Sequence, residues 1–168
     1  MQIEPATPHD LADIRAAYEH GRSTQREQKS IEWPEFTDAA ILREIESQLL
    51  FRVSEDDAII GVFSVAHDDA AIWGPHERGA HIYLHRIARA ANAPRGGLVD
   101  AILEWANAQC TALGRDGLRM DTWASNTALI AFYQRRGFRL VEERRLAADP
   151  RLSPHYHGNE FALLERAN

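Results

Sequence analysis

A turn with two glycines precedes a long helical pattern, and this arrangement suits the binding of a phosphate. Gly96 and Gly97 follow a β-rich run, residues 81–89, and lead into a segment from residue 98 in which apolar residues recur at helical spacing. The first N–H groups of a helix have no partner within it and lie at its positive end. The segment therefore predicts a phosphate or pyrophosphate site; the simpler alternative is an ordinary tight turn before a helix.

A second segment places a strand, a helix cap and an aromatic pair in succession. Residues 118–123 are rich in β-forming types, and Asn126 or Ser125 is suited to cap a helix that ends at Gly137. Tyr133 lies about two turns into this helix. The spacing therefore predicts a strand, a turn and a helix that carries a phenol.

Together, the two segments resemble the GCN5-related N-acetyltransferase (GNAT) superfamily. Residues 81–113 resemble its acetyl-CoA motif, and residues 121–138 resemble its second signature. The resemblance implies an α/β fold with a mixed, mostly antiparallel sheet, a central parallel β-α-β crossover and helices on both faces. It also implies transfer of an acetyl group from acetyl-CoA, as cosubstrate, to a primary amine of a small molecule, amino acid or peptide by direct attack, with no metal.

The resemblance further implies which residues contact the coenzyme. The backbone at the end of the first strand would pair with the pantetheine arm, and the residues there are Ile87, Ala88 and Arg89. The glycine turn would surround the pyrophosphate, and its residues are Arg95, Gly96, Gly97, Leu98 and Val99. Asn126 would lie near the pantetheine, and Tyr133 would lie near the thioester sulfur.

The implied reaction needs a base, an oxyanion donor and a proton donor. A neutral amine attacks the thioester, so its proton must be taken, the oxyanion must meet a donor, and the leaving thiolate needs a proton. The backbone N–H near Ala88 is the natural oxyanion donor. Tyr133 can protonate the thiolate because the ordinary pKa values of a phenol and a thiol are about 10 and 8.5. The alternative for Tyr133 is a half-buried ring that packs beside Phe132.

The first strand is also where a base is expected. Alternation along a strand places His81, Tyr83, His85 and Ile87 on one face. An imidazole has an ordinary pKa suited to proton transfer near neutral pH, and we predict that His85 is the base. The alternative is a strand histidine whose ring bonds a backbone carbonyl.

The glycine turn departs from the family pattern, which reads Arg/Gln-x-x-Gly-x-Gly/Ala. Pro94, Gly97 and Val99 stand at the three defined positions, so the polar residue is lost and the last small residue is larger. Proline also has no N–H to donate. These changes favour an alternative function, that of a non-catalytic protein that binds or senses acyl-CoA on the same fold.

Eight histidines raise a second alternative, a metal-dependent enzyme. His155 and His157 are two residues apart, a spacing at which two side chains on one strand face can share a metal, but no third ligand follows from the spacing. We therefore predict no metal site, and we interpret the pair as part of a loop or of the wall of a substrate groove.

Hydrophobic periodicity and turn residues predict the elements that position these segments. Thr7-Pro8 is suited to start a helix that ends near Gly21, and Thr37 is suited to start a second helix. Residues 72–78 are interpreted as an acceptor-side loop or a surface turn. The further strands are predicted at residues 2–6, 50–54, 58–67, 138–145 and 159–165. The expected order is β-α-α-β-β-β-α-β-α-β-β.

Composition limits the remaining questions. A chain of 168 residues that is 45% hydrophobic predicts a single N-acetyltransferase domain over residues 1–168. The net charge of −6 gives no basic field for nucleic acid or an anionic membrane. One cysteine, Cys110, and the lack of an apolar leader or spanning segment predict a cytoplasmic protein. The oligomeric state is open; the resemblance implies that a homodimer through sheet edges or helices is one option, with the exposed final strand as one candidate.

Overall fold

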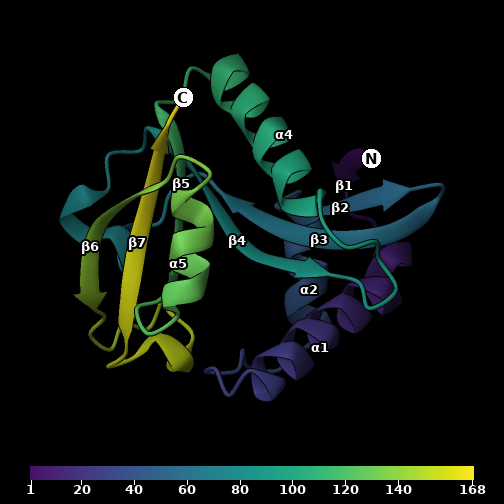
Figure 1. The fold of residues 1–168 in the computed structure, drawn as a ribbon, viewed down its shortest axis with the longest axis horizontal. Coiled ribbons are helices and arrows are strands. Elements are labelled where there is room, and N and C mark those ends of the chain that lie inside the picture. The colour runs from purple at the N-terminus through teal and green to yellow at the C-terminus, as the bar shows by residue number, and fades with distance from the viewer. The chain divides into compact units, whose positions relative to one another are not determined.

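The computed structural model describes residues 1–168, and Figure 1 labels the strands and the longer helices. They fall into two compact units: unit 1 comprises residues 1–65 and 84–106, and unit 2 comprises residues 66–83 and 107–168. Strand β4 (His81–Arg89) and helix α4 (Leu98–Leu113) each have residues in both units. The units are therefore interleaved along the chain. None of the helices is long and apolar enough to span a membrane.

The strands form a seven-stranded sheet in the order β1-β2-β3-β4-β5-β7-β6. Strands β4 and β5 run parallel and are connected through α4, whereas the pairs β1–β2, β2–β3, β5–β7 and β6–β7 are antiparallel. The predicted fold class, a mixed and mostly antiparallel sheet with a central parallel crossover, is confirmed. The other strands are β1 (Gln2–Pro5), β2 (Leu50–Glu55), β3 (Ala58–Ala66), β5 (Gly117–Trp123), β6 (Arg139–Arg145) and β7 (Glu160–Ala167).

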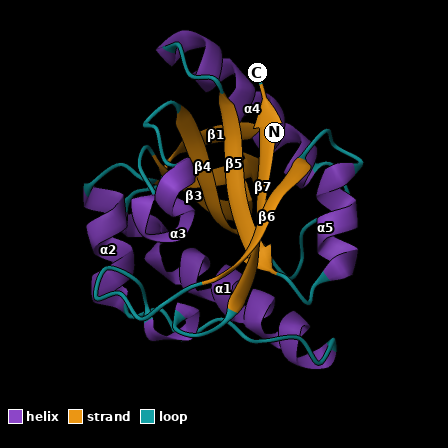
Figure 2. Ribbon diagram, turned by 90° about the vertical axis from the view of Figure 1, so that its left-hand side faces the viewer, coloured by secondary structure: helices purple, strands orange, loops and turns teal.

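Helices cover both faces of the strands in unit 1; Figure 2 distinguishes helices from strands by colour. Successive residues of a strand point to opposite faces. Leu50 and Val62 belong to a buried cluster with side chains of helices α1 (Leu11–Glu27) and α2 (Asp38–Glu46). Phe51 and Phe63, which are paired in register, face the other way and contact Trp105 of α4, with ring centroids 4.6 and 5.3 Å from it.

The predicted start of the first helix is confirmed. Thr7 and Asp10 form a capping box, in which the Asp10 carboxylate accepts hydrogen bonds from the Thr7 N–H at 2.7 Å and from its hydroxyl at 2.9 Å. Pro8 opens a short 3₁₀ turn, η1 (Pro8–Asp10), that leads directly into α1. The capped turn thus fixes where the chain passes from strand β1 into helix α1.

The predicted end of this helix near Gly21 is wrong, because α1 continues to Glu27. Gly21 provides room for a neighbouring ring: a Cβ at this position would lie 3.0 Å from the Trp33 ring. Arg22 and Arg26 also form ion pairs with Glu19 and with residue 32 along the outer surface. A glycine that is required by packing therefore resembles a helix stop when only the sequence is known.

The next three elements agree with their predictions. Thr37 caps α2, and its hydroxyl accepts a hydrogen bond from the Ala40 N–H at 3.3 Å. Strands β2 and β3 form a hairpin whose turn contains Asp56 and Asp57, both with positive φ. Two such residues in sequence are typical of the turns whose twist matches that of a hairpin.

A short helix in unit 2, α3 (Ala70–Trp73), was not predicted, and it is followed by the 3₁₀ turn η2 (Gly74–His76). Ile72 and Trp73 are buried and belong to the cluster that contains Tyr83, Trp123 and residues of β7. The interpretation of residues 72–78 as a simple surface turn is therefore wrong for the start of this segment. Four residues are too few to show a helical period.

The final strand does not lie at an edge of the sheet. Strand β7 pairs with β5 on one side and with β6 on the other, so β6 is the edge strand. The prediction that the final strand is exposed at an edge of the sheet is therefore wrong. Helix α5 (Thr127–Gln134) precedes β6, and the 3₁₀ turn η3 (Pro154–Tyr156) precedes β7. The predicted element order is confirmed, with the short helical segments added to it.

Candidate functional site

Strand β4 extends beyond its ladder with β5. The parallel ladder includes residues 81–83 of β4, whereas the strand continues to Arg89. The backbone groups on the β5 side of residues 84–89 are therefore outside that ladder. A strand edge of this kind can pair with an extended, amide-containing molecule. This part of β4 includes the residues whose backbone is predicted to pair with the pantetheine arm, namely Ile87, Ala88 and Arg89.

Arg86 interrupts the regular geometry of β4. Its φ is +50°, in the left-handed region, which costs a residue with a Cβ on the order of 1–3 kcal/mol. The alternation that was predicted to carry His85 and Ile87 on the same face as His81 therefore does not continue regularly past residue 85. A backbone conformation of this kind is found often at functional sites, where the surrounding structure holds it.

The loop between β4 and α4 is held by one hydrogen bond to β3, one within the loop and one from the last residue of β4. The Ala90 N–H donates to the Ile60 carbonyl of β3 at 2.9 Å, and the Ala93 N–H donates to the Ala90 carbonyl at 3.1 Å. The Arg89 side chain donates to the Ala93 carbonyl at 2.6 Å. Arg89 was predicted to act through its backbone, and the structure adds this second role for its side chain. Within unit 1 these bonds hold the end of β4 and residues 90–93 of the loop against β3.

The glycine turn leaves the first amides of α4 open. Gly96 and Gly97 have φ values of +88° and +79°, which residues with a Cβ rarely adopt. The Ala101 N–H donates to the Gly97 carbonyl, so the N–H groups of residues 98–100 precede the first bonds of the helix. Arg95 is exposed beside them. A Cβ at Gly96 would meet nothing within 4 Å, so the turn has open space next to it. These features fit a pyrophosphate, although Pro94 contributes no N–H.

Gly61 on β3 is a residue that sequence reasoning missed. A Cβ there would lie 2.7 Å from the Leu98 side chain and 3.0 Å from the Ala88 carbonyl oxygen. The absence of a side chain at this position lets the first turn of α4 pack closely on the sheet. The signal was present, since a glycine inside a run of β-branched residues indicates a close approach of another segment.

Asn126 and Tyr133 lie on one helix in unit 2. The Asn126 side-chain oxygen accepts a hydrogen bond from the Leu129 N–H at 3.1 Å, which confirms Asn126 as the cap of α5. The amide nitrogen of Asn126 is a donor as well, so the cap does not use its whole hydrogen-bonding capacity. Tyr133 and Asn126 are in unit 2, whereas the glycine turn and residues 87–89 are in unit 1. That these residues form one site stays a prediction.

Tyr133 is buried within aromatic neighbours. Its side chain is 6% exposed and makes edge contacts with Phe132 and Phe138, with ring centroids 5.2 and 5.6 Å away. Burial raises the pKa of Tyr133 well above its ordinary value of about 10, and the positive charge of Arg136 opposes this only in part. The phenol therefore keeps its proton throughout the physiological range and is a hydrogen-bond donor.

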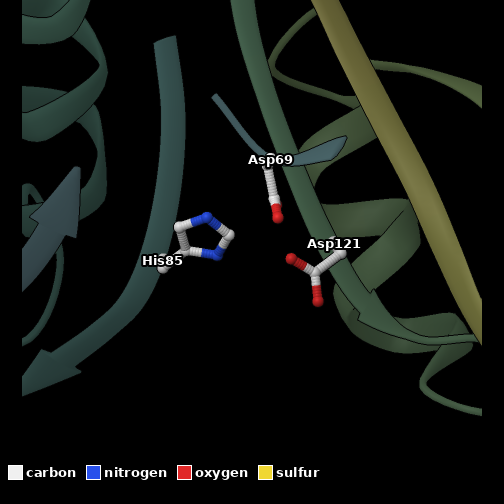
Figure 3. Close-up of side chains that lie close together, drawn as sticks. All are labelled: Asp69, His85 and Asp121. Atoms are coloured by element: carbon white, nitrogen blue, oxygen red, sulfur yellow. The ribbon is translucent and has the colours of Figure 1, made fainter. Parts of the chain in front are cut away.

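Figure 3 shows two aspartates of unit 2, together with His85 from the part of β4 that belongs to unit 1. Asp69 lies immediately before α3 and Asp121 lies on β5, and their carboxylate groups come within 4.8 Å of each other. His85 is half-buried. Sequence reasoning assigned a role to neither aspartate: Asp69 has no motif around it, and Asp121 lies at the start of the second signature, where the resemblance implies no role for it.

The two C-terminal histidines are engaged in local structure. His157 Nε2 lies 3.0 Å from the Asp149 carbonyl and 3.2 Å from the Leu152 carbonyl, and it donates to them because carbonyls only accept. The His155 ring packs against Trp123 and Tyr156. These contacts support the interpretation of the pair as part of a loop.

A buried arginine organises the polar interior of unit 2. Arg119 is 5% exposed, and two of its nitrogens bond one Glu165 oxygen at 2.8 and 2.7 Å. Its guanidinium also donates to the Tyr83 hydroxyl at 3.1 Å and lies 4.2 Å from the Trp73 ring centroid. Tyr83 in turn donates to Glu77, which also accepts from two backbone N–H groups. The network ties the segment that contains α3 and η2 to β4 and β5.

We expect the stability of the protein to fall when His81 becomes protonated. His81 is 7% exposed, and burial and the neighbouring Arg119 lower its pKa below the ordinary value of about 6.5, against the opposing effect of Glu165. The unfolded chain therefore binds this proton at a higher pH than the folded one, so stability is lost as the pH drops below about 6.5. Urea unfolding at pH 7.5 and 5.5 measures this loss.

The matched variants for this test are His81→Gln and His67→Gln, since His67 is an exposed histidine of the same unit. His81→Gln should lose less stability than the wild type between the two pH values, and His67→Gln should lose as much as the wild type. An equal loss in all three proteins would show that His81 does not account for the pH dependence.

Comparisons with known proteins agree with the described geometry. Residues 11–138 match the family model described as "Acetyltransferase (GNAT) family". A relative from Bacillus subtilis (strain 168), an uncharacterized N-acetyltransferase called YesJ, is 24% identical over 145 residues, which cover 82% of this chain and 81% of the relative.

Solved structures share the fold over nearly the whole chain. A GNAT-family acetyltransferase from Listeria monocytogenes 4b F2365 has a TM-score of 0.77 at 19% identity and covers 99% of this chain and 94% of its own. The PaiA N-acetyltransferase from Thermoplasma acidophilum, in complex with coenzyme A, has a TM-score of 0.69 at 17% identity, with 99% and 98% covered. Because the family model matches most of the sequence, the chain belongs to the acetyltransferase (GNAT) family.

Proposed function

We propose that the chain transfers an acetyl group from acetyl-CoA to a primary amine of a small molecule, amino acid or peptide by direct attack of the amine. Membership of the family supports acetyl transfer in general. The observation that carries the proposal is in unit 1, where the backbone of β4 beyond its ladder with β5 leads to the glycine turn at the start of α4, and Arg89 bonds the loop between them at Ala93.

The coenzyme fits these features by ordinary hydrogen-bond chemistry. The pantetheine arm contains amides, so it can pair with the backbone of residues 87–89 as an added strand would. The pyrophosphate can accept from the amides around Gly97 and from residues 98–100, and Arg95 adds a positive charge beside them. The local arrangement thus compensates for a net charge of −6.

Three groups of the chain are assigned to the transfer step. The Ala88 N–H donates to the oxyanion that forms when the amine attacks, and His85 takes the proton from the amine. The Tyr133 hydroxyl donates to the sulfur as the thiolate leaves. Burial raises the pKa of Tyr133 far above that of a thiol. We therefore assign to Tyr133 a hydrogen bond that stabilises the thiolate, with the proton staying on the phenol oxygen.

A pocket on the outer side of α1 is a candidate for the acceptor. Its volume is about 430 Å³, within the range of small-molecule sites, and it lies entirely in unit 1. Tyr18, Phe36 and Ile41 form an apolar part, and the charged groups are the carboxylates of Glu19 and Glu35 and the guanidinium groups of Arg15 and Arg22. The lining therefore offers an acceptor apolar contacts and charged groups of both signs.

The proposal is tested by binding and turnover measured separately. Calorimetry with CoA and with acetyl-CoA measures binding, and release of free thiol measures turnover. The acceptor panel should include an α-amino acid, an alkyl diamine, an arylalkyl amine and a peptide with a free N-terminus. Binding with turnover supports the proposal, and binding without turnover on any amine supports an acyl-CoA sensor instead. If neither CoA nor acetyl-CoA binds, both functions are excluded.

We expect His85→Ala to lower kcat/KM at pH 7 by about 100-fold and to remove the acidic limb of the pH–rate profile. The reason is that an imidazole must be neutral to accept the proton of the amine, so the rate of the wild type falls as the pH drops through the pKa of the base. The measurement is thiol release between pH 5.5 and 9 with the best amine of the panel. His67→Ala is the control, and an acidic limb that persists in His85→Ala would contradict the assignment.

A further inference from the structure

Arg86 has an unusual backbone conformation for a strand residue. Its φ is +50°, whereas the other residues with a Cβ and a positive φ lie in turns; these are Lys29, Gln48, Asp56 and Asp57. A strained conformation persists only where the surrounding contacts hold it, and it is concentrated near functional sites. The contacts of the Arg86 side chain therefore show what holds this part of β4 in place.

The Arg86 side chain is held by groups from α1, α2, β3 and the loop before α2. Its Nη2 donates to the Glu44 carboxylate on α2 and to the Ser64 hydroxyl on β3, the latter at 3.0 Å. The Ser64 hydroxyl donates to the other Glu44 oxygen at 3.0 Å, so the three residues form a closed set of bonds. The guanidinium carbon lies 5.1 Å from the Phe36 ring centroid and 6.0 Å from that of Tyr18.

These contacts are partly shielded from water, which strengthens them. The side chains of Arg86 and Glu44 are 24% and 26% exposed, and Ser64 is 3% exposed. A charge-assisted pair in such surroundings is screened less than a surface pair and has a better-defined geometry. The set of bonds can therefore fix the backbone of Arg86 and not only its side chain.

We propose that Arg86, held by Glu44 and Ser64, is a positioning residue that sets the path of β4 at Ile87, Ala88 and Arg89. Ala88 follows Arg86 by two residues and is buried in the same cluster as Tyr18, so a shift at Arg86 moves the Ala88 N–H directly. The inference rests on the proposed function, in which this N–H meets the oxyanion. Because Glu44 lies on α2, the orientation of that helix is coupled to the backbone geometry of residues 87–89, which is the part of β4 that is proposed to contact the coenzyme.

The first experiment measures the backbone and needs no turnover. The Ala90 N–H, which donates to Ile60, reports whether β4 stays in place against β3. Its hydrogen exchange, followed by NMR, should be about tenfold faster or more in Glu44→Gln and in Arg86→Gly than in the wild type. The control is Arg52→Ala, which removes an arginine of the same unit that forms two ion pairs and is 31% exposed; it should leave the exchange of the Ala90 N–H unchanged.

The second experiment separates the side chain from the backbone conformation. Glycine accepts a φ of +50° without strain, so Arg86→Ala removes the side-chain contacts and keeps the strain, whereas Arg86→Gly removes both. We expect kcat to fall by about tenfold or more in both variants, and the Kd of CoA to rise as well, because residues 87–89 are also proposed to pair with the pantetheine arm. Arg86→Lys, which keeps the charge and one donor to Glu44, should recover part of the loss.

The double variant Glu44→Gln/Arg86→Gly tests whether the two residues act together. Its kcat should equal that of Arg86→Gly, because Glu44 acts through Arg86. The proposal is overturned if Glu44→Gln leaves Ala90 exchange unchanged, or if Arg86→Gly lowers only the melting temperature, as Arg52→Ala is expected to do. If wild-type protein neither binds CoA nor releases thiol, the proposed function fails, and the exchange experiment still decides whether Arg86 positions β4.

Discussion

Replacement of Tyr133 by phenylalanine is expected to lower kcat by about 100-fold or more while the dissociation constant of CoA stays nearly constant. The substitution removes one oxygen and retains the ring that packs against Phe132 and Phe138, so little stability is lost from the packing. The hydroxyl would act on the thiolate only as it leaves, and an interaction made only in the transition state affects kcat and not ground-state binding.

The measurements for Tyr133→Phe are thiol release under saturating acetyl-CoA and calorimetry with CoA. Tyr156→Phe is the control, since Tyr156 is another tyrosine of unit 2 with aromatic neighbours. Because burial raises the pKa of Tyr133, the wild type should also show no loss of activity from ionisation of this phenol up to about pH 10. A kcat equal to that of the wild type would remove Tyr133 from the mechanism.

Substitution of Gly61 by alanine is expected to weaken CoA binding by about tenfold or more and to lower the free energy of unfolding by about 1–3 kcal/mol. The new Cβ would lie 2.7 Å from the Leu98 side chain and 3.0 Å from the Ala88 carbonyl. The end of the leucine can rotate, but the carbonyl is backbone and cannot. The first turn of α4 and the end of β4 must therefore move away from β3. This shift displaces the amides that are proposed to bind the pyrophosphate.

Calorimetry with CoA and urea unfolding measure the two effects of Gly61→Ala. Gly158→Ala in unit 2 is the matched control, because a Cβ there would meet nothing within 4 Å but the residue has a φ of +75°. The control should lose stability from backbone strain and should bind CoA as the wild type does. A stable Gly61→Ala protein with unchanged affinity for CoA would show that the packing of α4 on β3 does not determine the site.

The sequence was most informative where one local signal determines structure. The caps at Thr7, Thr37 and Asn126 were found because a short polar side chain before an apolar run has one common function. The strand, turn and helix around Gly96 and Gly97 were found for the same reason. These signals act over a few residues, and tertiary contacts do not override them.

Features that depend on distant residues could not be predicted. The helix continues through Gly21 because Trp33 occupies the space beside it, and this contact is visible only in the folded protein. The Arg119–Glu165 pair is buried because strands far apart in the sequence are neighbours, and nothing in the sequence near Arg119 indicates burial. The left-handed conformation of Arg86 has the same origin, since Glu44 and Ser64 hold it from other elements.

The position of β7 between β5 and β6 has a consequence for the order of events during synthesis. Strand β5 is complete at residue 123 and β6 at residue 145, but both pair with residues 160–167. Until that last segment leaves the ribosome, two strands have unpaired edges that can associate with other chains. Arginines and glutamates make up most of β6, and their charges reduce that risk while the nascent chain waits for its partner.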